Sequence, residues 1–175
     1  MHWPRKLAAL GFATVLAVAM GCARSDTPLS PAGSEPVQPS ASLVSTLSNL
    51  HLLSCSAQAY AVTSKSIGVE GGVIVVGTHR LVIPAGALSR SVTIKAEQVT
   101  GSVNSVRFAP QGLQFAKSAT LTLSYANCSP LLVVKRIVYT DDLLRILELL
   151  PSLDNIFSKT VSAPIRHFSR YAVAW

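Results

Sequence analysis

The chain has 175 residues and a net charge of +7, and 49% of its residues are hydrophobic whereas 6% are aromatic. Its basic residues are scattered and do not alternate with aromatic residues, so nucleic-acid binding is not expected. No paired metal-ligand spacing, phosphate loop or nucleophile elbow is present, so we expect no metal, no cofactor and no enzyme. The four histidines without such spacing are His2, His51, His79 and His167.

The first 21 residues are organised like a signal peptide. Arg5 and Lys6 form a short positive region, and residues 7–20 are an uncharged, mostly apolar run of fourteen residues. This run is shorter than the about 20 apolar residues that a membrane-spanning helix needs. Residues 1–21 are therefore predicted to be an export signal.

Cys22 follows the small residues Ala19 and Gly21 at the end of the apolar run. This arrangement resembles the bacterial lipobox, in which the cysteine is diacylated and becomes the mature N-terminus. Ala23, rather than Asp, after the cysteine resembles lipoproteins that are sorted to the outer membrane. The resemblance implies a lipid anchor at Cys22, and the alternative is a secreted or periplasmic soluble protein with an unmodified Cys22.

A flexible tether is expected after the anchor, over residues 22–60. Residues 23–42 contain many Ser and Ala residues and no large apolar cluster, so they cannot bury enough surface to fold. Pro-rich segments act as semi-rigid spacers, and this one could reach roughly 60 Å from a bilayer. Residues 42–53 can form one short helix at the edge of the folded domain. The prolines of the tether are Pro28, Pro31, Pro36 and Pro39.

The remaining chain, residues 61–175, has the pattern of an all-β domain. Leu121, Leu123 and Tyr125 share one face of a strictly alternating run, as in a half-buried strand. Regular strands joined by short turns favour a single antiparallel β-sandwich. The predicted strands are 72–76, 80–83, 91–99, 105–109, 119–125, 132–140, 160–166 and 168–175.

A specific corner follows the pair Gly71-Gly72, because residues 81–83 end at Pro84 and Gly86. Pro84 removes a backbone donor and stops regular pairing, and Gly86 can adopt a positive φ. This spacing resembles the ZU-five domain, the β-sandwich of ankyrins, zonula occludens proteins and netrin receptors, which also occurs in bacterial exported proteins. The resemblance covers residues 66–175. Its further matching segments are 112–115, 121–123 and 167–169.

Residues 143–150 have a helix-forming composition, and Asp141-Asp142 before them could cap a helix. The ZU-five resemblance instead implies a strand here, with Asp141-Asp142 as the hairpin turn. We adopt the strand.

Cys55 and Cys128 form an even pair if Cys22 carries the lipid. In an oxidising compartment such a pair predicts a disulfide, and two free buried thiols are the alternative. The bridge would hold the segment that enters the domain against the end of a central strand.

The tripeptide His167-Phe168-Ser169 is the one chemically suggestive constellation. In certain ZU-five proteins of death-domain adaptors, and in a nucleoporin, it cleaves itself between Phe and Ser. Transferred here, His167 would be the base and Ser169 the nucleophile that attacks the Phe168 carbonyl. The structural alternative places Phe168 in the core, with His167 and Ser169 on the other side of the strand or bonded to the backbone.

These observations predict a non-enzymatic lipoprotein of the bacterial envelope, whose sandwich is a structural or protein-interaction module. Its expected partners are the membrane, through the lipid, and an unidentified envelope or surface protein. One alternative is a self-processing module that cleaves between Phe168 and Ser169. Another is a carbohydrate- or surface-binding sandwich, which the low aromatic content makes less attractive.

Overall fold

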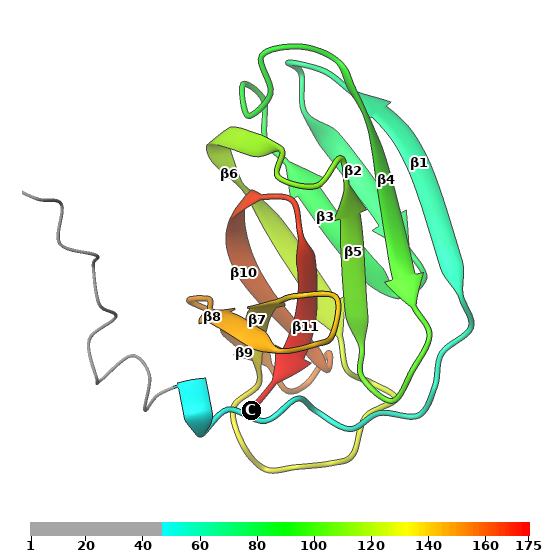
Figure 1. Ribbon diagram of the computed structural model, residues 1–175, viewed down its shortest axis with the longest axis vertical. Helices are drawn as coiled ribbons and strands as arrows, with labels where there is room; N and C mark the ends of the chain where they lie inside the picture. Colours follow the sequence, from blue (N-terminus) through cyan, green and yellow to red (C-terminus); the bar gives the residue numbers. More distant parts are fainter. Residues whose placement is uncertain (1–46) are drawn as a thin grey trace, which may run out of the picture. The chain divides into compact units, whose positions relative to one another are not determined.

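The computed structural model describes residues 47–175, which form two antiparallel sheets packed face to face (Figure 1). One sheet has the order β1-β4-β5-β11-β7-β8 and the other has the order β2-β3-β6-β10-β9. The antiparallel β-sandwich is therefore confirmed. The strands of the first sheet are β1 (Ala61–Ile67), β4 (Val92–Val99), β5 (Ser105–Ala109), β11 (Arg170–Ala174), β7 (Arg136–Thr140) and β8 (Ile146–Leu149). Those of the second are β2 (Gly72–Val76), β3 (His79–Ile83), β6 (Gln114–Ser124), β10 (Thr160–His167) and β9 (Leu153–Asn155).

Alternation along the strands builds the core between the two sheets. In β4, Ile94 is fully buried and its neighbour Lys95 is exposed. In and just after β6, the predicted face of Leu121, Leu123 and Tyr125 is buried. Because the side-chain period of a strand is two, this pattern fixes the register of the central strands.

The chain turns sharply after β3, at the corner expected around Pro84. Gly71 and Gly86 both adopt left-handed backbone conformations, with φ of 73° and 75°. A Cβ atom on Gly71 would overlap the carbonyl oxygen of Ile83, so glycine is required there. The amide of Gly86 donates a 2.7 Å hydrogen bond to the Val69 carbonyl, which joins this corner to the β1–β2 turn.

The predicted hairpin after β7 is present. The Asp141 carboxylate accepts hydrogen bonds from the amides of Leu143 (3.0 Å) and Arg145 (2.8 Å), so it bends the chain as an Asx turn. Residues 143–145 consequently belong to the turn, and β8 begins at Ile146 and pairs with β7.

Several local predictions differ from the structure. β6 begins at Gln114, whereas its strand was expected over 119–125. Strands β1 and β9 were not predicted, since β1 is a polar edge strand and β9 has three residues. The strand expected over 132–140 begins only at Arg136. Of the helix expected over 42–53, Leu47 and Ser48 are helical, residues 42–46 lie outside the described residues, and the chain is extended from Leu50.

The extended segment replaces the end of that helix because it pairs with the last strand. The His51 amide donates to the Trp175 carbonyl (3.2 Å), and the Trp175 amide donates to the His51 carbonyl (3.0 Å). Leu52 forms an antiparallel bridge with Ala174. Within residues 47–175, no helix is long and apolar enough to cross a bilayer.

Candidate functional site

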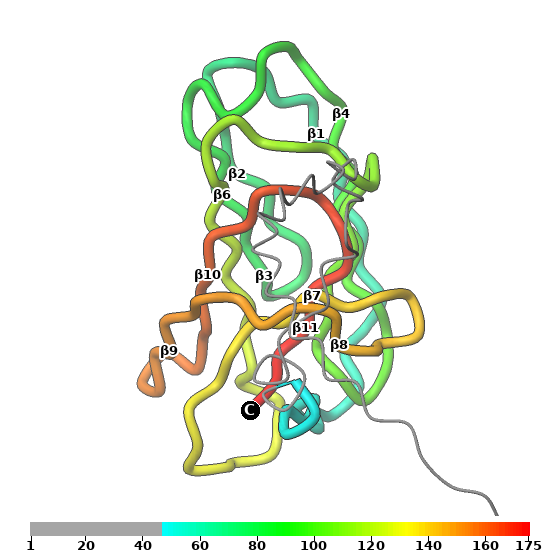
Figure 2. Tube along the Cα trace, turned by 60° about the vertical axis from the view of Figure 1, so that its left-hand side comes forward, coloured from blue at the N-terminus to red at the C-terminus, as the bar shows by residue number. Residues whose placement is uncertain are grey.

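The predicted site residues, apart from Cys22, lie at opposite ends of the sandwich, and Cys22 is outside the described residues. We call one end the turn end; it comprises residues 68–71, 84–88, 110–113 and 167–169. We call the other the disulfide end; it comprises residues 50–59, 100–104, 125–135 and 155–159. The segment that follows residue 47 reaches the sandwich at the disulfide end (Figure 2).

Cys55 and Cys128 form the predicted disulfide, with an S–S distance of 2.08 Å. The two residues also face each other in an isolated antiparallel bridge. The amide of Ser129 donates to the carbonyl of Ser54 at 2.9 Å. The incoming segment is thus held covalently against the chain that follows β6.

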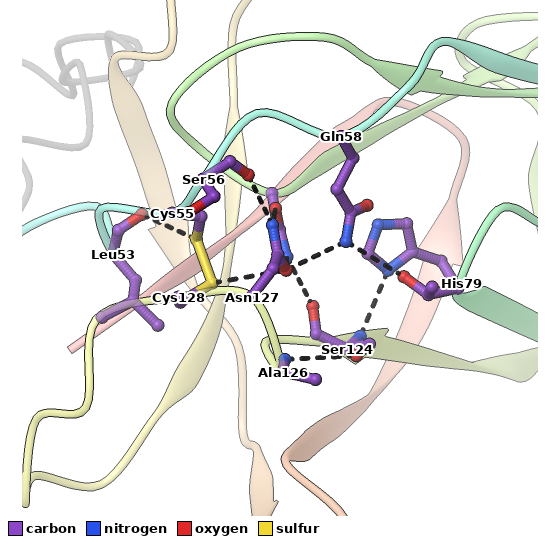
Figure 3. The surroundings of a disulfide bond; sticks show 11 residues. Leu53, Cys55, Ser56, Gln58, His79, Ser124, Ala126, Asn127 and Cys128 are labelled. Carbon is purple, nitrogen blue, oxygen red and sulfur yellow. Dashed lines mark hydrogen bonds between the residues drawn. A yellow bond between two sulfur atoms is a disulfide. The ribbon is translucent and has the colours of Figure 1, made fainter.

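Asn127, next to the disulfide, connects three segments through its side-chain amide (Figure 3). Its Nδ2 atom donates to the Ser56 carbonyl at 2.6 Å. Its Oδ1 atom accepts from Gln58 Nε2 at 2.9 Å and from Asn104 Nδ2 at 2.7 Å. A carboxamide offers donors and acceptors together, so Asn127 serves as a structural hub for these loops.

His79 is buried at the edge of this network, with 1% of its surface exposed. Its Nδ1 atom accepts a 3.1 Å hydrogen bond from the Ser124 amide, so Nε2 carries the proton in the neutral ring. Nε2 has no hydrogen-bond partner. Burial lowers the pKa of His79 to about 4, because the charged form would lose its hydration. His79 is therefore a neutral structural residue at neutral pH.

An apolar cleft of about 350 Å³ lies beside the disulfide, between residues 128–135 and 154–159. Lys135 organises one wall, since its Nζ atom donates to the carbonyls of Leu131 and Val133, both at 2.6 Å. The same ammonium group lies 5.4 Å from the centre of the Tyr125 ring, within the range of a cation–π contact.

Asp154 joins the two walls of the cleft. It accepts a 2.6 Å hydrogen bond from the Tyr125 hydroxyl and a 2.8 Å bond from the Lys135 amide. Burial and the bond to Asp154 raise the pKa of Tyr125, so the hydroxyl stays protonated and keeps donating. These bonds fix the floor of the cleft, whereas the outer side chains remain free.

At the turn end, His167-Phe168-Ser169 forms the corner between β10 and β11. Phe168 is buried, with its ring centre 5.1 Å from that of Phe108 and 5.0 Å from that of Phe115. The Phe168 carbonyl accepts a 2.9 Å hydrogen bond from the Gly112 amide. Phe168 thus has the core position of the structural alternative.

The His167 ring contacts two tyrosines, Tyr139 and Tyr171. It packs edge-on against Tyr139, and its Nδ1 atom is 3.5 Å from the Tyr171 hydroxyl. Among residues 47–175, no hydrogen bond joins the His167 and Ser169 side chains. The Tyr171 hydroxyl donates to the His167 carbonyl at 2.6 Å. Burial raises the pKa of Tyr171.

The sequence analysis missed the apolar cleft because residues 132–134 of the loop at 131–134 were assigned to a strand over 132–140. Two signals favour a loop: Pro130 precedes them, and their four apolar residues in a row lack the alternation of a half-buried strand. Within residues 47–175 no group of three or more His, Cys, Asp or Glu side chains is placed to hold a metal ion.

No family model matches this chain, and no curated protein matches it. Its function is therefore inferred from the geometry of the two ends of the sandwich.

Proposed function

We propose that this chain is a lipoprotein of the bacterial envelope, held at the membrane by a lipid on Cys22. Its sandwich, of ZU-five type, is a non-enzymatic structural or protein-interaction module. The observation that carries the proposal is the disulfide between Cys55 and Cys128, at the point where the N-terminal segment joins the sandwich. Disulfides persist in oxidising compartments such as the periplasm, which supports export.

The position of the disulfide suits a tethered domain. A chain anchored at its N-terminus transmits any pull to the first residues that pair with the sandwich, and among residues 47–175 these lie in the segment 50–55. The pairing of His51 with Trp175 consists of two backbone hydrogen bonds, which would resist such a pull less than a covalent bond does. The covalent bond at Cys55 protects the sandwich beyond it from such a pull.

The exposed features of the molecule favour binding over catalysis. Its polar side chains near the disulfide, such as Asn127 and Asn104, are used in holding loops together. Leu132 and Phe157 are large apolar side chains that are almost fully exposed. Apolar surface of this kind marks interaction sites. The proposed partners are the membrane and an envelope or surface protein, with the outer membrane as the proposed location.

The test is the intact mass of the exported chain, beside a Cys22→Ser control. We expect a mature chain that begins at Cys22, carries acyl groups and sediments with the membrane fraction, whereas the control lacks the acyl mass. An exported chain with an unmodified Cys22, free in the soluble fraction, would overturn the proposal.

A further inference from the structure

Large apolar side chains are strongly exposed at the disulfide end. The exposed fractions are 106% for Leu132, 95% for Phe157, 65% for Ile156 and 61% for Val134. Away from this end, Val69 at the turn end is exposed at 57% and Leu143 in the β7–β8 hairpin at 77%. Figure 2 shows the loop before β7 and the β9–β10 turn projecting at this end of the molecule.

We propose that these two loops dock on the surface of an anionic lipid bilayer. We call the inserting surface the apolar tip, and it comprises Leu131, Leu132, Val133, Val134, Ile156 and Phe157. The proposal deepens the proposed function and rests on it only for the lipid anchor that would bring the bilayer close.

Several backbone polar groups of the apolar tip have hydrogen-bond partners within the protein, so they can be transferred out of water. A polar backbone group that loses water without a partner costs several kcal/mol in hydrocarbon. Here the carbonyls of Leu131 and Val133 accept bonds from the Lys135 ammonium, which is itself buried. The Leu131 amide donates to the Ser129 carbonyl at 2.9 Å. The loop thus satisfies these groups internally and leaves the side chains of its tip exposed.

The charges around the tip complement an anionic surface. Arg136 follows the first loop and Lys159 follows the second, and both are exposed. The nearby acidic group, Asp154, is half-buried and bonded to Tyr125 and to the Lys135 amide. An apolar surface beside free basic side chains is typical of segments that lie in the interface of anionic membranes.

The path of the chain favours a bilayer over a second copy of this chain. The N-terminal segment joins the sandwich at the disulfide end, and Cys55 is bonded to Cys128, three residues before Leu131. The chain that precedes residue 47 leads to Cys22. A lipid there would therefore keep a bilayer within reach of the end of the sandwich that carries the apolar tip.

The experiment places a tryptophan reporter at each end of the exported full chain. Phe157→Trp reports on the tip and Val69→Trp on the turn end, each in a Trp175→Phe background that alone serves as the blank. The chain is mixed with vesicles of phosphatidylglycerol and brominated phosphatidylcholine, whose bromine atoms quench tryptophan only within the bilayer. Both reporter positions are exposed, so neither change disturbs the core.

We expect the emission at position 157 to shift to the blue and to be quenched, while the emission at position 69 changes little. Lys159→Gln should lower the ratio of docked to free domains about fivefold, because each basic residue near an anionic surface contributes about that factor. Leu132→Asp should lower the quenching at position 157 further.

Three results would overturn the proposal. The first is no quenching at position 157, and the second is equal quenching at positions 157 and 69. The third is a blue shift at 157 that depends on protein concentration and needs no vesicles, which indicates a second copy. The mass of the same sample reports acylation of Cys22 independently. Quenching with an unmodified Cys22 would support the docking proposal and contradict the lipid anchor. An acylated chain without quenching would support the anchor and contradict the docking proposal.

Discussion

At the turn end, a main-chain hydrogen bond from the Gly86 amide to the Val69 carbonyl and the glycines Gly71 and Gly86 close the corner after β3. At the disulfide end, side chains hold the loops: a disulfide, the amide of Asn127 and the ammonium of Lys135. Loops closed by backbone hydrogen bonds favour small residues, and these expose little side-chain surface to solvent. Closure by buried side chains leaves the outer residues of the loops free, and these are the apolar tip.

Among the changes that distinguish the two ends, removal of the disulfide should cause the largest loss of unfolding free energy. The bridge closes a loop with a sequence separation of 73 residues, and the chain-entropy model gives it about 4 kcal/mol of stabilisation. We expect the double variant Cys55→Ser with Cys128→Ser to lose about that amount of unfolding free energy in urea. A loss below about 1 kcal/mol would show that the side-chain network closes this end without the covalent bond.

Acid should weaken the disulfide end through His79. The folded pKa is about 4 and the unfolded value is 6.5, so between these values the unfolded chain binds a proton that the folded protein excludes. The stabilisation is therefore complete above pH 6.5 and is lost as the pH falls towards 4. The total loss is roughly 3 kcal/mol, at 1.36 kcal/mol per pKa unit. Urea unfolding across this range measures it.

The matched control for that titration is His79→Asn. The Asn side chain keeps an acceptor for the Ser124 amide, which bonds Nδ1 of His79 in the parent at 3.1 Å, and it does not titrate. The pH dependence between 4 and 6.5 should flatten in the variant. An unchanged slope would assign the acid sensitivity to other groups.

At the turn end, the backbone itself should be the sensitive element. Gly71→Ala introduces a Cβ atom that overlaps the Ile83 carbonyl oxygen at a φ of 73°, and we expect a loss of about 3 kcal/mol. Gly112→Ala is the control, since its φ is 77° but no atom lies within 4 Å of the new Cβ, and it should cost about 1 kcal/mol. Equal losses would mean that φ alone, and not the close approach, requires glycine.

Alternation made most of the fold predictable from the sequence. Residues such as Leu121 and Leu123 identify a core strand because one face is wholly apolar. β1 was not predictable in this way: its exposed Lys65 and Ser64 belong to an edge strand, whose place depends on pairing with β4. Local pattern carries no information about such distant pairing.

Of the candidate site, only the disulfide was predictable, because its two cysteines can be identified as a pair from the sequence. The even pair of Cys55 and Cys128 sufficed to predict the disulfide, because such a pair is expected to bond in an oxidising compartment. Asn127 and Lys135 gave no signal, because their roles come from carbonyl groups that the fold brings to them. Residues 131–134 have the composition of a strand, and the bonds from Lys135 to two of their carbonyls hold them as a loop instead.

The smallest effect is expected for Ser169→Ala, which tests whether the turn end is chemically inert. Self-cleavage would need the His167 ring to reach Ser169, whereas the ring packs on Tyr139. It would also separate β11 from β10, although β11 lies between β5 and β7 in its sheet. We therefore expect the denatured masses of the parent and of the variant both to correspond to chains that end at Trp175. A parent that alone lacks residues 169–175 would contradict this and would make the turn end a self-processing site.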